Sequence, residues 1–420
     1  MVVDPDPVVV DAVVRVTGDV RPAVDHEHPQ PQLRGQPLCH HRVGEPGAHD
    51  EHVAPIGGGA AHTHRIRSPR PGGPGDYRRG PMERSLLAVA PVDHPGGAET
   101  TLLRLLAGLD ERDWQVTLST PGSGALRDAG REAGWATVSL PLGGLRRRRG
   151  ARAVGSWMRA RRLAGNHEVV YLNGTVCGRL LPALRGSGAR LVLHVHDVVA
   201  RVPGIWHGAD VVLAASQAVA DRLDGLDAHV VYPPVDPDPP DVEVPWPPGD
   251  GPLVGYVGRI EPRKGARDLV QAAPAIHAGA PAARVILVGE DDFGVDRRYR
   301  DAVVAAEGIE HYGWVEGGAG LMRHLDVLVL PAHREPAGTV LAEAMAAGTP
   351  VVATRVDGLA EIVHDGVTGL LVEPGDPDAL ATAVLRVLER RGDMGAAAAE
   401  RARRFHTPRY VDAVEKLISG

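Results

Sequence analysis

The sequence predicts an α/β protein with two doubly wound parallel sheets, and three observations support this expectation. Near-continuous Val and Leu runs of strand length alternate with segments of helix length, which is typical of parallel strands buried on both faces. The alternation occurs twice, because a stretch crowded with Pro, Asp and Gly at residues 232–252 divides it. A chain of 420 residues is also too long for one ordinary core.

The composition limits the class of protein further. Hydrophobic residues make up 43% of the chain, but it has only two Phe, so the core must be built from Val, Leu and Ala. A net charge of −7 argues against a nucleic-acid partner. Cys39 and Cys177 form no disulfide framework or metal-ligand spacing, which fits a reducing compartment. Without an apolar run of membrane-spanning length or a signal-peptide pattern, we expect a cytoplasmic protein, at most peripheral on the inner face of the plasma membrane.

Residues 1–81 differ from the rest of the chain. They are rich in Pro, Gly, His, Arg and Asp, contain one aromatic residue (Tyr77), and show no sustained helical or strand period. We expect a disordered, low-complexity extension. Its histidines are irregularly spaced and do not predict a metal site. The working protein is expected to begin near Met82, where the first strand-like run starts.

Residues 82–236 are expected to form the first domain, a Rossmann-like sheet. Seven apolar runs begin at residues 86, 114, 136, 168, 190, 210 and 229. In such sheets ligands bind at the carboxyl ends of the strands. The first of these ends carries Gly96 and Gly97 just before a helix, where paired glycines let the backbone approach a phosphate or a sugar. A simple tight turn is the alternative.

A second strand end carries two histidines. Alternate residues of a strand share a face, so His194 and His196 are expected to point together, with His196 nearer the end of the strand. No third ligand with suitable spacing follows, so we predict no metal. His194 is expected to be a core histidine with satisfied hydrogen bonds. Asn173 lies at the end of the preceding strand and is a candidate contact for an acceptor.

The segment from Arg146 to Arg162 predicts a basic, partly amphipathic helix that begins near Leu145. Eight arginines are interleaved with Trp157 and Met158. Such a helix suits an anionic membrane surface or an acidic, phosphate-linked lipid. A solvated helix is an equally good interpretation, and the sequence leaves both open.

Residues 237–251 are expected to be a linker, a connector rather than a packed element, and residues 252–400 a second Rossmann-like domain. Its first strand ends at Arg259, and Lys264 stands at the start of the following helix. Together they offer a planar fork and a mobile point charge, which suit two phosphates. Residues 401–420 predict a final helix.

Glu335 and Glu343 are the most informative pair in this second domain. Glu335 precedes a helix and Glu343 lies within it. In a helix, side chains eight positions apart differ in direction by about 80° and lie about 12 Å apart along the axis. The two carboxylates can therefore face one cleft at its opposite ends. Between them Ala337, Gly338 and Thr339 are expected to form the first turn, whose N–H groups attract an anion. A nucleotide-sugar has hydroxyls at both ends and phosphate between them.

Two segments resemble the donor-binding motifs of family-4 glycosyltransferases with the GT-B fold. One is GYVGRIEPRKG at residues 255–265, and the other is the E-x7-E pair followed by EAMAAGTPVVAT, which ends at Thr354. The resemblance covers residues 82–420. It implies two Rossmann-like domains facing a central cleft, with the last helix returning to the first domain. It also implies transfer from a UDP-, GDP- or ADP-sugar to a glycan, lipid-linked or small-molecule acceptor, with retention and without a metal or other cofactor.

The resemblance also suggests roles for the candidate residues. Lys264, Arg259 and the Gly338 turn would stabilise charge on the leaving diphosphate. Glu343 would bind ribose hydroxyls and Glu335 a sugar hydroxyl. His196 would lie beside the reacting sugar, the Gly96–Gly97 loop near the donor diphosphate, and residues 289–290 and 313–315 near the base. Two alternatives stay open: an epimerase, whose second set of acid–base carboxylates we cannot locate, and a nucleotide-sugar-binding protein without turnover.

Overall fold

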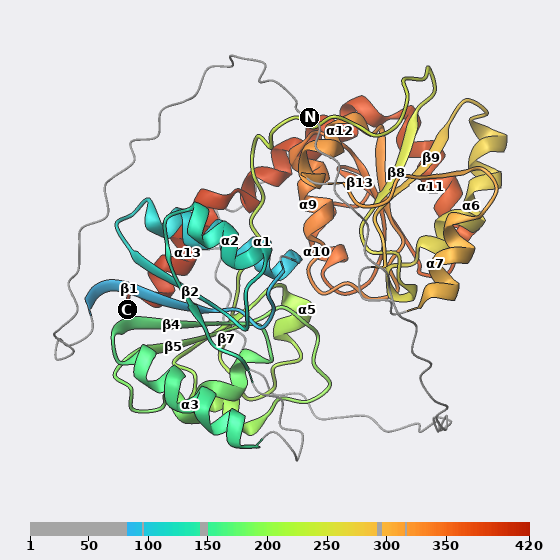
Figure 1. Ribbon diagram of the computed structural model, residues 1–420. Helices are drawn as coiled ribbons and strands as arrows, with labels where there is room; N and C mark the ends of the chain where they lie inside the picture. Colours follow the sequence, from blue (N-terminus) through green and yellow to red (C-terminus); the bar gives the residue numbers. More distant parts are fainter. Residues whose placement is uncertain (1–81, 95, 143–149, 292–295, 316) are drawn as a thin grey trace, which may run out of the picture. The chain divides into compact units, whose positions relative to one another are not determined.

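The computed structural model describes residues 82–94, 96–142, 150–291, 296–315 and 317–420. The described chain forms one seven-stranded and one six-stranded sheet, each wholly parallel and flanked by helices (Figure 1). The prediction of two Rossmann-like α/β domains is therefore confirmed. The predicted extension at residues 1–81 lies outside the described residues.

The first sheet contains seven strands in the order β3-β2-β1-β4-β5-β6-β7. Residues 82–89 run beside both β2 and β4, which makes β1 a central strand. Several strands end earlier than the apolar runs suggest, since β3 has four residues and β7 has three. The bounds are β1 (Met82–Val89), β2 (Gln115–Thr120), β3 (Ala136–Ser139), β4 (His167–Asn173), β5 (Arg190–Val195), β6 (Val211–Ala214) and β7 (Ala228–Val230).

Side chains of this sheet alternate between two apolar clusters. Leu86 and Ala88 of β1 belong to a cluster with α1 and α13, whereas Leu87 and Val89 belong to one with α3 and α4. This period of two is what a strand buried on both faces requires. The helices of this half are α1 (Gly97–Asp110), α2 (Ala125–Glu132), α3 (Gly150–Ala164), α4 (Leu181–Leu184), α5 (Gln217–Ala220) and the 3₁₀ turns η1 (Cys177–Leu180) and η2 (Gly204–Gly208).

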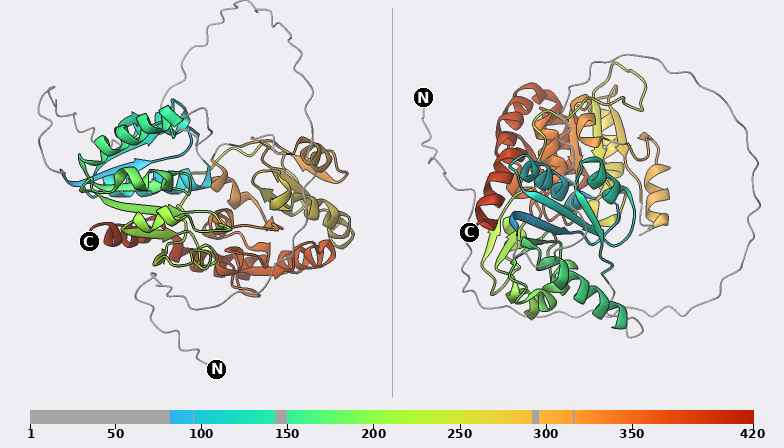
Figure 2. Two further views of the ribbon diagram at one scale, coloured as in Figure 1. Left: turned by 90° about the horizontal axis from the view of Figure 1, so that it is seen from below. Right: turned by 60° about the vertical axis from the view of Figure 1, so that its left-hand side comes forward.

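The last helix, α13 (Thr407–Ile418), packs against α1 of the first sheet (Figures 1 and 2). Val411 and Val414 are buried in the same cluster as the α1 leucines. The Glu415 carboxylate accepts hydrogen bonds from Trp114 Nε1 at 2.8 Å and from Arg112 at 2.7 Å. The end of the chain thus supplies part of the core of the first sheet.

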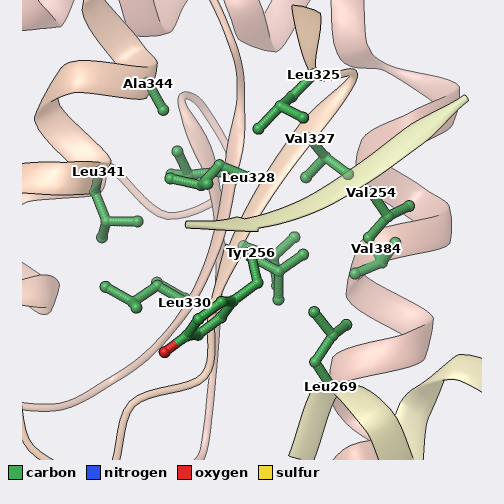
Figure 3. Packing of buried hydrophobic residues seen from close by; sticks show 14 of the residues in the cluster. Val254, Tyr256, Leu269, Leu325, Val327, Leu328, Leu330, Leu341, Ala344 and Val384 are labelled. Carbon is green, nitrogen blue, oxygen red and sulfur yellow. The ribbon is translucent and has the colours of Figure 1, made fainter. Parts of the chain in front are cut away.

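The second sheet has the order β10-β9-β8-β11-β12-β13. Figure 3 shows Leu341 and Ala344 of α9 on one side of β8, with Leu269 of α6 and Val384 of α11 on the other. The strands are β8 (Leu253–Val257), β9 (Arg284–Val288), β10 (Ile309–His311), β11 (Val327–Leu330), β12 (Val351–Thr354) and β13 (Gly369–Val372). The helices are α6 (Ala266–Gly279), α7 (Arg297–Val304), α8 (Gly318–Leu321), α9 (Thr339–Ala346), α10 (Leu359–Ile362), α11 (Pro377–Glu389) and α12 (Arg391–Ala402), with the 3₁₀ turns η3 (Pro262–Lys264), η4 (Met322–His324) and η5 (Arg403–Phe405).

The connector between β7 and β8 is more tightly packed than its composition suggests. Val235 is fully buried and Trp246 is 5% exposed, and both belong to the core cluster of the second sheet. The Trp246 ring meets the Tyr312 ring edge to face, 5.7 Å between centroids. Residues 237–251 do connect the two sheets without a helix or strand. The expectation that they are not packed is wrong, because Trp246 anchors a segment otherwise dominated by Pro and Asp.

In each sheet the order in which strands are added along the chain reverses at one strand, β1 in the first sheet and β8 in the second. From β8 the chain builds β9 and β10 outward, then returns to place β11 on the other side of β8. The first sheet does the same between β1 and β4. Ligands of open α/β sheets bind at the carboxyl ends of the strands at such switch points. The loops after β8 and β11, and those after β1 and β4, are therefore the places to seek a site.

Candidate functional site

The loop after β8 is held tightly against the loop after β11. Gly265 adopts a φ of 71°, and a Cβ placed on it would lie 1.8 Å from the carbonyl oxygen of Pro331. Only glycine combines this conformation with so close an approach. The N–H groups of His333 and Arg334 both donate to the Arg263 carbonyl, at 2.8 and 3.3 Å. These backbone contacts bring Lys264 next to Glu335.

Five charged side chains form a ladder across these two loops. Glu261 pairs with Arg259 at 3.3 Å and with Arg263 at 2.9 Å. Arg263 also reaches Glu335 at 3.4 Å, and Lys264 forms an ion pair with the same carboxylate. Three cations against two carboxylates leave one net positive charge. Arg259 and Arg263 remain 35% and 38% exposed, so they are open to a further anionic partner.

The Glu335 carboxylate is buried and fully paired. Its second oxygen accepts from the Gly338 N–H at 3.4 Å. Burial raises the pKa of Glu335, but the Lys264 ammonium, the Arg263 guanidinium and the Gly338 N–H together outweigh it, and the net pKa is lowered. The group is therefore a carboxylate at neutral pH and can accept hydrogen bonds from hydroxyls.

Helix α9 begins slightly later than predicted. Its first residue is Thr339, with Gly338 as the N-cap at a φ of 66°. The expectation that Ala337 lies in the first turn is therefore wrong, because the left-handed backbone at Gly338 ends the loop one residue further on. The start of the helix still points the positive end of its dipole toward the loop that carries Glu335, and the Gly338 N–H donates to that carboxylate.

Glu343 has a different partner from Glu335. Its carboxylate forms an ion pair with Arg104 of α1 at 3.1 Å. Arg104 also donates to the Pro234 carbonyl at 2.7 Å. Burial raises the pKa of Glu343, and the Arg104 guanidinium offsets this only in part. The structure thus brings together Arg259, Lys264 and Glu335, while Glu343 lies along α9 with a cation of its own.

At the end of β1, Gly96 is the N-cap of α1. Its N–H donates to Glu99 at 3.2 Å. A Cβ placed on Gly97 would meet nothing within 4 Å, so this part of the loop faces open space. Burial raises the pKa of Glu99, with the Gly96 hydrogen bond acting in the opposite direction. An open N–H-rich turn is consistent with the predicted approach of a phosphate or sugar.

His194 and His196 lie on one face of β5 and the residue that follows it, as predicted. Their ring centroids are 3.9 Å apart. His194 is buried, and its Nδ1 shares a hydrogen bond of 2.6 Å with the Tyr171 hydroxyl. Its Nε2 has no partner among the described residues, so the prediction of satisfied hydrogen bonds is wrong. Burial lowers the pKa of His196 to about 4, so its imidazole is neutral at neutral pH.

Asn173 is paired with His196 rather than exposed. Its side-chain oxygen lies 2.8 Å from His196 Nε2, and its amide nitrogen donates to the Ala98 carbonyl at 3.4 Å. Only 1% of the residue is exposed. In this structure Asn173 therefore orients His196 and is not open to a direct acceptor contact.

Sequence reasoning missed Glu261, Arg263 and Arg104. Glu261 and Arg263 stand within the quoted segment GYVGRIEPRKG, and their alternating charges were the available signal. Arg104 carries no local signal, because its partner lies 239 residues away. The Arg146–Arg149 part of the basic segment and the predicted helix start near Leu145 lie outside the described residues, and α3 is described from Gly150 onward.

Comparison with known proteins identifies two family domains. The model described as Glycosyltransferase Family 4 matches residues 95–239, and the one described as Glycosyl transferases group 1 matches residues 251–390. The fold resembles the crystal structure of Anabaena HepE in complex with UDP-glucose, with a TM-score of 0.68, 21% identity, and coverage of 80% of this chain and 99% of that one.

Two curated relatives differ in how much of their length is matched. A glycogen synthase from Mycobacterium tuberculosis is 40% identical over 152 residues, which is 35% of this chain and 36% of that protein. A phosphatidyl-myo-inositol mannosyltransferase from Mycobacterium leprae is 32% identical over 350 residues, which is 77% of this chain and 93% of that protein. With both sheets, both domain models and this near-full-length relative in agreement, the chain belongs to the family of GT-B glycosyltransferases that group 1 and family 4 domains define.

Proposed function

We propose that this protein transfers a glycosyl residue from a nucleotide-sugar to an acceptor with retention of anomeric configuration and without a divalent metal. The single observation that carries the proposal is the charge ladder at the start of α9. Three cations alternate there with the buried carboxylates of Glu261 and Glu335, beside the positive end of the helix dipole. A diphosphate requires positive charge, and a sugar requires a hydrogen-bond acceptor, within one small region.

Arg259 and Lys264 are assigned to the leaving diphosphate. An ammonium has three N–H donors, and one of them suffices for Glu335, so Lys264 can keep its ion pair while binding a phosphate oxygen. The backbone N–H of Thr339, at the start of α9, adds a donor fixed before the reaction begins. Positive charge from these groups fills the role that a metal ion plays in other phosphate sites, which is the basis for proposing metal independence.

The two glutamates are assigned to hydroxyls at the two ends of the donor. Glu335 is held as a carboxylate and would accept from a hydroxyl of the transferred sugar. Glu343 would accept from the ribose. Because Arg104 is bonded to Glu343, ribose binding would either share this carboxylate with Arg104 or displace it. Glu343 is buried and its pKa is raised, so its surroundings disfavour charge and suit a neutral hydroxyl as the hydrogen-bond partner.

His196 and the Gly96–Gly97 loop are assigned to the first-domain side of the reaction. His196 Nε2–H donates to the Asn173 side-chain oxygen, so in the neutral imidazole Nδ1 is the acceptor that can receive a hydrogen bond from the reacting sugar. The open backbone at Gly97 would let a phosphate or sugar approach. The acceptor would be a glycan, a lipid-linked molecule or a small molecule.

The end of β9 is assigned to the nucleoside base. Arg300 holds the Glu290 carboxylate at 2.8 and 3.0 Å and lowers its pKa. Trp314 is 65% exposed, which is unusual for so large an apolar ring and provides a surface for stacking. Uridine, guanosine and adenosine all present a stacking face, so this region supports no choice among them.

A panel of UDP-, GDP- and ADP-sugars tests the proposal. The full chain is incubated with each donor, and products are followed by chromatography and by NMR of the anomeric proton. Transfer or slow donor hydrolysis with retained configuration supports the proposal, and unchanged rates with EDTA support metal independence. Isomerised donor without release would favour the epimerase alternative. Thermal stabilisation without any turnover would favour the binding protein.

Helix α3 supports a second proposal, contact with an anionic membrane surface. Val154 and Met158 lie one helical turn apart and are 53% and 70% exposed. Arg159 is exposed beside them. Trp157, by contrast, packs partly into the core, and Arg161 donates to the Ala183 carbonyl at 3.0 Å, so neither is part of the proposed surface.

The surrounding sequence is strongly basic. Between residues 133 and 196 the sequence has eleven arginines and one carboxylate, that of Glu168, despite the net −7 of the chain. Exposed aliphatic side chains flanked by arginine are typical of helices that lie in the headgroup region. No helix among the described residues has the length and apolar character needed to cross a bilayer.

Vesicle flotation tests this surface. We expect binding to vesicles of phosphatidylcholine with phosphatidylglycerol, and none to phosphatidylcholine alone. Changing Val154→Asn together with Met158→Gln should weaken flotation at least several-fold. Val367→Asn is the matched control, because Val367 is 43% exposed in the other domain. Flotation that ignores lipid charge, or an equal loss in the control, would remove the membrane proposal.

A further inference from the structure

Asp357 lies in the turn between β12 and α10 and contacts the backbone of the Glu335 loop. Its carboxylate accepts from the Glu335 N–H at 3.0 Å. The next residue, Gly358, donates its N–H to the Glu335 carbonyl at 3.1 Å. Two adjacent residues of one turn therefore hold both backbone polar groups of Glu335.

The backbone at this turn is unusual for a residue with a side chain. Asp357 has a φ of 38°, a left-handed conformation that glycine adopts most easily and that Asp tolerates better than most other residues. A Cβ placed on Gly358 would lie 2.3 Å from the Pro336 carbonyl oxygen, so the turn is pressed directly against the loop. A carboxylate is thus present where the backbone alone would favour glycine.

We propose that Asp357 is a positioning residue that fixes the Glu335 loop for glycosyl transfer, an inference that rests on the role proposed above for Glu335. Lys264, Arg263 and the Gly338 N–H hold the carboxylate of Glu335. Asp357 and Gly358 hold its main chain. The ion pairs of the side chain can persist when the loop moves, because long charged side chains adjust. The main-chain contacts fix the loop itself, and so they set the position of the carboxylate relative to the sugar.

Two substitutions separate positioning from a structural role in the turn. Asp357→Gly relieves the left-handed backbone but removes the acceptor, so the melting temperature should stay or rise while kcat falls about ten-fold or more and the donor KM changes less than about three-fold. Asp357→Asn keeps an acceptor oxygen and should retain kcat within about three-fold. Wild-type kcat in Asp357→Gly would overturn the proposal, as would an equal loss in both variants.

Hydrogen exchange of the Glu335 amide provides a readout that does not need turnover. The amide should be protected in the wild type and in Asp357→Asn, and should exchange at least several-fold faster in Asp357→Gly. Unchanged protection in Asp357→Gly would overturn the proposed hold. If no donor supports turnover in the wild type, the proposed function fails, and the exchange pattern still decides whether Asp357 fixes this loop.

Discussion

Lys264 and Glu335 form a buried ion pair although 71 residues of sequence separate them. Their side chains are only 14% and 11% exposed, so neither charge is well solvated. Buried charges are tolerated when each has a partner, and here Arg263 is a second cation for the same carboxylate. The pair joins the two loops that flank the switch point of the second sheet.

Neutralising either member of this pair should stop glycosyl transfer. We expect Glu335→Gln and Lys264→Ala each to lower kcat about 100-fold or more, because each removes charge fixed in place before the reaction. Arg267→Ala is the matched control, since Arg267 is an exposed cation on the neighbouring helix and outside the ladder. The measurement is steady-state transfer with circular dichroism to verify folding. Full activity in both variants would refute the proposed site.

The same pair should show coupling in stability. Lys264→Met and Glu335→Gln are each expected to cost about 1–3 kcal/mol in the free energy of unfolding, reduced because Arg263 stays beside Glu335. The double variant should cost less than the two single values added together, because it leaves no unpaired buried charge. Urea unfolding of the four proteins measures the difference. Strict additivity would mean that the two groups do not interact.

His196 should make stability depend on acid pH. Its pKa is about 4 in the folded protein, below the ordinary value of 6.5, so the unfolded chain takes up a proton first as pH falls. Stability is then lost progressively between pH 6.5 and pH 4, by up to about 3 kcal/mol from this residue. His196→Gln should lose less stability than the wild type over that range. Urea titrations of the wild type and His196→Gln at pH 7 and pH 4.5 measure this difference in the loss of stability. Identical losses in the two proteins would contradict the prediction.

Gly265 should be far less replaceable than Gly348. Both adopt left-handed backbone, with φ values of 71° and 79°, but a Cβ on Gly348 would meet nothing within 4 Å. Gly348→Ala should cost about 1 kcal/mol from backbone strain alone. Gly265→Ala should cost more than about 3 kcal/mol, because it forces Pro331 away, and should weaken donor binding as the loops separate. Equal costs in thermal unfolding would show that the loops are not in close contact.

Removing α13 should destabilise the first sheet. A chain ending at His406 loses Val411, Val414 and the Glu415 contacts with Trp114, so apolar surface of α1 is exposed. We expect a lower melting temperature and binding of a hydrophobic dye. A chain lacking only Ser419 and Gly420, both exposed, is the control and should behave as the wild type. An unchanged melting temperature after the longer deletion would contradict this role of α13.

Local pattern sufficed to predict the two sheets, because apolar runs identified the strands. The positions of Arg259, Lys264 and Glu335 near predicted strand ends indicated a shared site only together with the resemblance to the family-4 donor motifs. The ladder itself and the Arg104–Glu343 pair were not predictable, because they join residues up to 239 positions apart through tertiary packing. The burial of Trp246 was also missed, because the Pro-rich composition of residues 237–251 gives no sign that one ring within them is buried.

The packing of α13 against α1 has a consequence for synthesis of the protein. The ribosome makes the strands of the first sheet before those of the second, but the helix that covers the α1 leucines follows the strands of both sheets. Until α13 has been made and has docked, the apolar layer over β1 is incomplete. Native packing of the first sheet is therefore completed only when a helix made long after its strands reaches α1.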